Sequence, residues 1–203
     1  DREVSFNQLV QPLNKEFPDR KCKVYLLHGD MTDEEMHAMY THPKVRAAVS
    51  FTHGEGFGLP LFEAAYMGVP VIAPGWSGQC DFLFDNNRKE KFYNVSFDID
   101  AIPEAVLWEG VLIKESGWCY PREASAKEKM RLCYTDIGRL DKDPKDTKNN
   151  VAATAASHAE YLKEEFEKEK MYAEFISAMG IERIKKEFDV ENWITSLDIE
   201  EIE

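Results

Sequence analysis

The stretch that decides the fold is GEGFGLPLFEAAYMGVPVIAPGWSGQCDFL, residues 54–83. It opens with a loop that has glycine at every second position, and the mostly apolar residues 59–67 that follow predict a helix. Gly68 is of the residue type that commonly ends helices, and residues 69–73 (VPVIA) are a short apolar run typical of a buried strand. A second glycine-bearing turn comes next, at 75–78. This order of loop, helix, strand and turn predicts one unit of a parallel α/β sheet.

Further elements flank this stretch on both sides. Upstream, residues 32–35 (TDEE) form a capping-box pattern that predicts a helix as far as Tyr40. Apolar periodicity predicts further helices over residues 5–17, 81–84, 123–134 and from 151 onward, a last helix after Asp189, and strands over 23–27, 47–51, 92–97 and 106–113. Residues 138–150 (GRLDKDPKDTKNN) are polar and predict a mobile loop.

The alternation of strands and helices predicts the fold class, which is α/β with a Rossmann-like parallel sheet and helices on both faces. We expect a single domain over the whole of residues 1–203. Within it, residues 1–137 would form the α/β core, and residues 151–203 would form a helical C-terminal segment after the mobile loop.

The composition excludes several classes of function. The 203 residues include 25 Lys and Arg against 38 Asp and Glu, which gives a formal net charge of -13. No basic cluster is present to neutralise phosphates along a duplex, so we expect no nucleic-acid binding. No apolar run approaches the roughly 20 residues of a membrane span, and no signal-peptide pattern opens the sequence, so we expect a protein that is not transmembrane. The four cysteines lack the spacing of a zinc site, and we interpret them as reduced thiols of a cytoplasmic protein.

The glycine loop does not match the commonest glycine-rich motifs. The dinucleotide fingerprint G-x-G-x-x-G would need a third glycine at the position of Leu59. The Gly-Lys-Ser/Thr of a P-loop and the Gly-x-Ser-x-Gly of hydrolases are also missing. What remains is a helix N-terminus at Gly58 and Leu59, where free amides and the helix dipole can bind a phosphate.

Two carboxylates frame this helix N-terminus. Glu55 precedes the helix, and Glu63 lies in its second turn. Because helical side chains lean toward the N-terminus, Glu63 points back toward whatever the amides hold. A carboxylate in that position can accept a hydrogen bond from each hydroxyl of a vicinal diol. A phosphate and a diol together indicate a nucleotide as the ligand.

The motif Glu55-Gly-Phe-Gly-Leu-Pro-Leu-Phe-Glu63, followed by Gly68-Val-Pro-Val-Ile-Ala73 and the Ser77-Gly78 turn, resembles the C-terminal half of group 1 (family 4) retaining glycosyltransferases. The variant is similar to phage- and marine-type members, and the resemblance covers residues 23–84. Members of this family have the GT-B architecture, in which two Rossmann-like domains face each other across a cleft. The resemblance implies that this chain is the C-terminal domain, which binds the nucleotide sugar.

The resemblance also implies roles for individual residues. Glu55 would lie beside the transferring sugar as the catalytic residue, and Glu63 would hold the donor ribose. Asp81 stands where the family has a glutamate after its small-residue turn. The donor-binding residues implied in this way are Glu63, Gly56, Phe57, Gly58, Leu59, Gly29, Asp30, Ser77 and Gly78. Within this set, Gly29 and Asp30 would lie near the base of the nucleotide.

The implied reaction is retaining transfer of a hexosyl group from a nucleotide-diphosphate sugar to an acceptor hydroxyl, by front-face displacement. The family generally needs no metal, so no metal and no other cofactor are expected. Family members supply an Arg and a Lys for the leaving diphosphate from a first strand, and they bind the acceptor with an N-terminal domain. Neither is recognised in this sequence, so we expect an N-terminally truncated enzyme whose activity depends on those parts.

Two alternatives remain open at this point. One is a fragment of a GT-B-fold nucleotide-sugar epimerase, and the other is a non-catalytic module that binds nucleotide sugars. The base, the sugar and the acceptor are not specified by these residues. Apolar surface left by the absent first strand would favour self-association, so a homo-oligomer is a further hypothesis.

Overall fold

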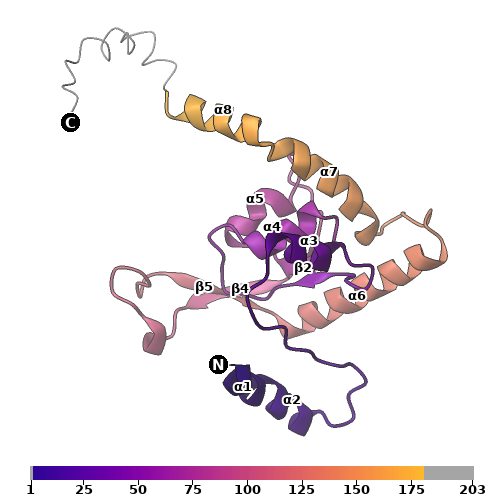
Figure 1. Cartoon of the computed structure of the whole chain (residues 1–203). Coiled ribbons are helices and arrows are strands. Elements are labelled where there is room, and N and C mark those ends of the chain that lie inside the picture. The colour runs from indigo at the N-terminus through magenta and orange to yellow at the C-terminus, as the bar shows by residue number, and fades with distance from the viewer. Residues whose placement is uncertain (1, 181–203) are drawn as a thin grey trace, which may run out of the picture. The chain divides into compact units, whose positions relative to one another are not determined.

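The structure, a computed structural model, describes residues 2–180 (Figure 1). The chain divides into two compact units, Asp1–Met39 and Tyr40–Glu203. The predicted last helix after Asp189 lies outside the described residues. Across residues 2–180, no helix combines the length and the apolar character that a membrane crossing needs.

The first unit begins with consecutive helical segments. They are α1 (Arg2–Ser5), a π-helical turn (Phe6–Val10) and α2 (Gln11–Glu16). These segments confirm the helix predicted over residues 5–17. Helix α3 (Asp33–Thr41) spans the boundary of the two units in the sequence. Its start confirms the predicted capping box, because the Thr32 amide donates to Glu35 Oε2 (2.9 Å) and the Glu35 amide donates to Thr32 Oγ1 (3.3 Å).

Residues 23–27 of the first unit correct a prediction. This apolar run was expected to be a buried strand, and it forms no strand. Its side chains are exposed, with accessible fractions of 81% for Tyr25 and 70% for Leu27. An apolar run becomes a strand only where a neighbouring strand completes its backbone hydrogen bonds. Within the described residues of this unit, no strand is present to do so.

The second unit is built on a parallel sheet of three strands. In spatial order they are β1 (Ala48–Val49), β2 (Val71–Pro74) and β3 (Tyr93–Val95). All four residues of β2 are buried, as expected for a strand that is covered on both faces. The mixed α/β class with a parallel sheet is therefore confirmed. The strands predicted over 47–51, 69–73 and 92–97 are all found with altered bounds, and Phe97 belongs to a separate strand.

Helices pack against this sheet and continue the chain beyond it (Figure 1). Helix α4 (Leu59–Tyr66) packs against β1 and β2, and α6 (Glu123–Lys142) packs against β2 and β3. The short helix α5 (Cys80–Leu83) confirms the helix predicted near 81–84. After them come α7 (Ala155–Glu165), which packs on α4, and α8 (Lys168–Ala178). The helical C-terminal segment predicted from 151 onward is thus confirmed as far as the described residues reach.

An antiparallel hairpin follows β3, and the sequence did not predict it. Strands β4 (Phe97–Ala101) and β5 (Gly117–Pro121) pair along their whole lengths. The strand predicted over 106–113 is wrong, because this segment is the connection between β4 and β5. Within it the chain turns back on itself, and the backbones of Trp108 and Leu112 exchange two hydrogen bonds (3.1 and 2.7 Å).

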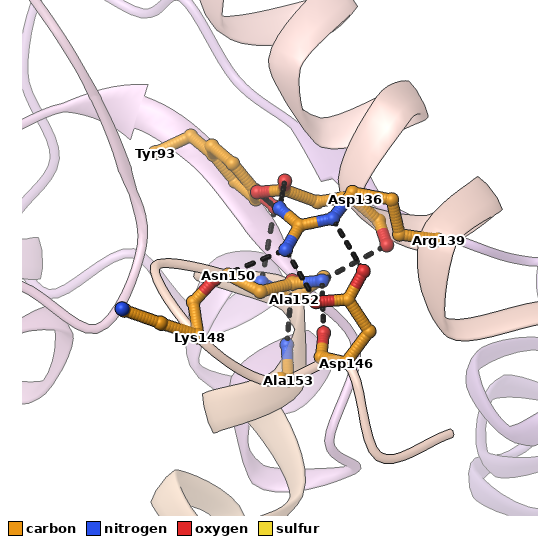
Figure 2. Close-up of polar contacts among 8 residues, drawn as sticks. All are labelled: Tyr93, Asp136, Arg139, Asp146, Lys148, Asn150, Ala152 and Ala153. Carbon is orange, nitrogen blue, oxygen red and sulfur yellow. Dashed lines mark hydrogen bonds and ion pairs between the residues drawn. The ribbon is translucent and has the colours of Figure 1, made fainter. Parts of the chain in front are cut away.

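Helix α6 runs further than predicted, and polar contacts hold the chain that follows it (Figure 2). Residues 138–142 are helical where a loop was predicted, so the helix predicted over 123–134 extends to Lys142. Arg139 donates to both carboxylate oxygens of Asp146, at 2.8 and 2.6 Å. The side chains that make these contacts are polar or charged. They leave no apolar periodicity, so the sequence pattern did not reveal this part of the structure.

Asp136 lies at the centre of the same polar network and is only 1% exposed. Its Oδ2 accepts a hydrogen bond from the Tyr93 hydroxyl (2.8 Å), and its Oδ1 lies 3.3 Å from Arg139 Nη1. The Tyr93 hydroxyl also accepts from the Ala152 amide (3.0 Å). Burial, and then the bond to Asp136, raises the pKa of Tyr93. The network therefore joins β3, α6 and the start of the C-terminal helices.

Candidate functional site

Gly58 begins helix α4 in a backbone conformation that favours glycine. It is the N-cap residue, with φ 92° and ψ 49° in the left-handed region. Its carbonyl oxygen accepts hydrogen bonds from the amides of Leu61 and Phe62, both at 2.9 Å. Pro60 lies in the first turn and has no N–H group. The donors available at this helix end are therefore the amides that precede Pro60.

These amides are not used by the rest of the fold. Among the hydrogen bonds of residues 2–180, none engages the N–H groups of Gly56, Phe57, Gly58 or Leu59. Free amides at a helix N-terminus, together with the positive end of the helix dipole, bind anions. This arrangement can hold a phosphate or a diphosphate.

The turn after β2 lies directly against the glycine loop. The Gly78 amide donates to the carbonyl oxygen of Glu55 (3.1 Å), and Ser77 Oγ donates to the same oxygen (2.7 Å). A Cβ atom at Gly78 would lie 2.0 Å from the carbonyl oxygen of Gly56, so only glycine fits at this position. The structure thus brings together the predicted residues of the loop and of the small-residue turn.

Gln79 is buried beneath the loop, and the sequence did not indicate it. The side chain is 0% exposed, and its Nε2 donates to the carbonyl oxygen of Pro74 (2.9 Å). Its Oε1 is buried without a hydrogen-bond partner among the described residues. A Cβ added to Gly58 would lie 3.6 Å from the Cβ of Gln79, so the two residues are neighbours. The only sequence signal for Gln79 was its position between Gly78 and the apolar helix α5.

Glu63 lies half-buried on α4 beside Tyr40, the second residue that the sequence did not indicate. The Tyr40 hydroxyl lies 3.2 Å from the carbonyl oxygen of Pro60. Burial, followed by the charge of the neighbouring Glu63 carboxylate and a hydrogen bond to it, raises the pKa of Tyr40. The phenol therefore lies beside the Glu63 carboxylate at the first turns of the helix. In the sequence, Tyr40 was only the end of a predicted helix, and no pattern connected it to Glu63.

Phe57 combines two roles in the loop. Its ring packs among Phe62, Phe82 and Phe166, with centroid distances of 5.2, 5.1 and 6.0 Å. This aromatic cluster anchors the loop to α4, α5 and the end of α7. Only the amide of Phe57 is thus left to contribute to the candidate site.

Three of the residues implied by the resemblance make none of the contacts described above. Gly29 and Asp30 belong to the first unit, where Gly29 has φ 138° and Asp30 is exposed. The site described here is built from residues of the second unit, and the expected place of the base belongs to the first unit. Asp81 is exposed in the first turn of α5.

Two cavities lie elsewhere in the second unit. One of about 470 Å³ is lined by residues that include Tyr40, Arg46 and Pro70, and one of about 500 Å³ lies between Arg46 and α6. Because Pro70 precedes β2, the first cavity is at the N-terminal end of that strand. The glycine loop follows β1 and Ser77 follows β2, at the C-terminal ends, where open parallel sheets bind their ligands. We therefore favour the loop over the cavities.

The chemistry of the loop is that of an anion and hydroxyl binder. Over the described residues, no group of three or more His, Cys, Asp and Glu side chains is arranged to hold a metal ion. Comparison with known proteins gives no identification, because no family model, no curated protein and no solved structure matches the chain. The assignment of a function therefore depends on the residues and their geometry.

Proposed function

We propose that the chain is the donor-binding domain of a retaining glycosyltransferase of the GT-B type. In this proposal it binds a nucleotide-diphosphate sugar, from which a hexosyl group passes to an acceptor hydroxyl. The observation that carries the proposal is the set of unengaged amides at the start of α4, with the Glu63 carboxylate in the second turn of the same helix. The position of this loop at the C-terminal end of a parallel strand supports a Rossmann-like GT-B domain.

Each part of the donor has a group of matching chemistry at the loop. The diphosphate would accept hydrogen bonds from the amides of residues 56–59, which are charge-assisted and therefore strong. The Glu63 carboxylate would accept from the two ribose hydroxyls. Glu55 precedes these amides in the sequence, whereas Glu63 follows them. Glu55 would face the hexosyl group. Four cysteines in the thiol form are consistent with a cytoplasmic location, which is part of the proposal.

A second candidate function is a nucleotide-sugar-binding module without transferase activity. Developing negative charge on a leaving diphosphate is usually stabilised by cations. The side chains that contact the loop or Glu63 include Ser77, Gln79 and Tyr40, and none of these is a cation. This observation favours a partner domain that supplies the cations, or a module that only binds.

Calorimetry of the chain with UDP, GDP and ADP tests the proposal. We expect one of the three to bind, and we expect its binding to survive EDTA because the loop offers amides rather than metal ligands. Failure of all three to bind, or a loss of binding in EDTA that Mg²⁺ or Mn²⁺ restores, would contradict the proposal. Release of the nucleoside diphosphate from its hexose donor, measured with a full-length form that includes this chain, then separates a transferase from a module that only binds.

A further inference from the structure

His53 stands directly before the glycine loop and is held by strand β5. The Cys119 amide donates to the carbonyl oxygen of His53 (3.0 Å), and Nδ1 of the His53 ring lies 2.7 Å from the carbonyl oxygen of Cys119. The imidazole is stacked on the Trp118 ring, with centroids 4.5 Å apart and planes at 5°. The Tyr120 ring lies 4.8 Å away at a tilt of 56°. The ring of His53 is therefore fixed in position although the residue is exposed.

The bond to Cys119 determines which ring nitrogen carries the proton. A carbonyl oxygen can only accept a hydrogen bond, so Nδ1 of His53 must be the donor. In the neutral imidazole, Nε2 is then unprotonated and acts as an acceptor. No hydrogen bond among the described residues engages Nε2. The result is an oriented, accessible acceptor nitrogen.

The segment that carries His53 runs along the same turn as the glycine loop. A Cβ atom added to Gly54 would lie 3.6 Å from Ser77 Oγ and 3.7 Å from Trp76 Nε1. Ser77 in turn donates to the carbonyl oxygen of Glu55. His53 thus precedes Glu55 by two residues, in a segment that lies against the same turn as the loop.

The chemistry of this acceptor limits what it can bind. A phosphate or carboxylate that is ionised has no proton to donate, so an unprotonated Nε2 selects hydroxyl or N–H groups. The rings of Trp118 and Tyr120 lie beside it and provide an apolar surface with polar edges. Small-molecule sites typically combine such a surface with a small number of polar groups. A sugar ring offers hydroxyl donors and apolar C–H faces together.

We propose that Nε2 of His53 accepts a hydrogen bond from a hydroxyl of the hexosyl group, and so helps to select the sugar of the donor. This inference rests on the proposed function, because it assumes that the amides of the loop hold the diphosphate. It goes beyond that proposal by assigning sugar recognition to a residue outside the Glu55–Glu63 motif. The competing explanation is that His53 only ties the loop to β5.

Two amide variants separate these explanations. His53→Asn retains an N–H group near the position of Nδ1, so the bond to Cys119 can persist, but it has no atom at the position of Nε2. His53→Gln places an amide near the position of Nε2 and loses the group at Nδ1. The measurement is calorimetry of each variant with the nucleoside diphosphate that binds the wild-type chain, and with hexose donors that carry the same base.

We expect His53→Asn to bind the nucleoside diphosphate like the wild-type chain and to bind the preferred hexose donor about fivefold more weakly, the effect of one neutral hydrogen bond. His53→Gln should retain more of the sugar-dependent affinity than His53→Asn. Equal donor affinity in His53→Asn and wild type overturns the inference and leaves the proposed function standing. Failure of the wild-type chain to bind any nucleoside diphosphate overturns both.

Nuclear magnetic resonance of the wild-type chain tests the premise without variants or ligand. Long-range ¹H–¹⁵N spectra of the neutral His53 ring should place the proton on Nδ1. A proton on Nε2 would make that nitrogen a donor and would overturn the inference, whatever the variants do.

Discussion

Two polar clusters of the second unit differ in how completely their hydrogen bonds are made. In the Asp136 network, the carboxylate, the Tyr93 hydroxyl and the Arg139 guanidinium all have partners within the chain (Figure 2). At the glycine loop, the amides of residues 56–59 and the Oε1 of Gln79 have none among residues 2–180. Buried polar groups that hold a fold are normally paired. The paired groups of the first cluster are those expected of a structural network, whereas the second cluster leaves donors free for the ligand that we propose.

The largest effect is expected from removing the central carboxylate of the network. Asp136→Ala leaves the buried Tyr93 hydroxyl without its acceptor and removes one partner of Arg139, so it should lower the free energy of unfolding by about 3 kcal/mol. Asp141→Ala is the matched control on the same helix, because its ion pair with Arg46 is exposed and should contribute less than about 1 kcal/mol. Urea unfolding measures both. Equal losses in the two variants would show that the network does not maintain the fold.

The next effect concerns the ligand and not the fold. Glu63→Ala should weaken nucleoside diphosphate binding by about 10- to 150-fold, since it removes charge-assisted hydrogen bonds worth roughly 1.5–3 kcal/mol. Glu55→Gln should leave this affinity nearly unchanged, because Glu55 is proposed to face the sugar. Tyr40→Phe should give a smaller loss than Glu63→Ala. Calorimetry with the nucleoside diphosphate measures all three, and the reverse order for the two glutamates would exchange their proposed roles.

Two left-handed glycines give a paired test of the loop. Gly58 and Gly68 have φ values of 92° and 76°, so alanine at either position should cost about 1–2 kcal/mol of stability through backbone strain. Only Gly58 borders the free amides, whereas Gly68 lies against α7. Gly58→Ala should therefore lose nucleoside diphosphate affinity, and Gly68→Ala should keep it. Similar affinities for the two variants in calorimetry would mean that this helix end is not the site.

The smallest effect depends on pH and comes from His158 on α7. Its Nε2 donates to the carbonyl oxygen of Phe82 (2.7 Å), and burial lowers the pKa of His158 from 6.5. The unfolded chain therefore takes up this proton at a higher pH than the folded chain does. Stability should accordingly fall as the pH falls from about 6.5 toward the lowered pKa, and this loss is absent above that window.

His158→Gln isolates this contribution. Glutamine keeps an N–H donor for Phe82 and does not titrate, while other groups near His158, such as Lys91 and Asp85, remain in place. Urea midpoints measured over about pH 5 to 7 should fall less steeply toward acid in the variant than in the wild-type chain. Parallel curves would mean that His158 has the same pKa in the folded and unfolded states.

The sequence predicted those parts of the fold that have a local signal. Helix α4 follows from the apolar run between Gly58 and Gly68, and strand β2 follows from the apolar residues 69–73. The hairpin has no such run, because the apolar residues of β4 alternate with Asp98 and Asp100 and four of its five residues are exposed. The strand prediction for residues 23–27 failed for the opposite reason. Their apolar run is present, but a local pattern does not show whether a neighbouring strand exists.

The residues of the candidate site likewise include some with a local sequence signal and some without one. Glu55, Glu63 and the loop glycines are adjacent in the sequence, so their spacing could indicate them. Tyr40 and His53 contact residues that are 20 and 66 positions away, which no local pattern records. Gln79 is close in sequence, but its unpaired Oε1 becomes evident only in the folded chain.

The central claim is that the amides at the start of α4 bind the diphosphate, and amide chemical shifts test it most directly. ¹H–¹⁵N spectra should be recorded as the nucleoside diphosphate that binds in calorimetry is added to the wild-type chain. The amides of residues 56–59 should shift with the occupancy of the site, while those of Asp136, Asn150 and Ala152 should not. Shifts confined to the polar network or to the cavity beside Arg46, with none at residues 56–59, would contradict the claim.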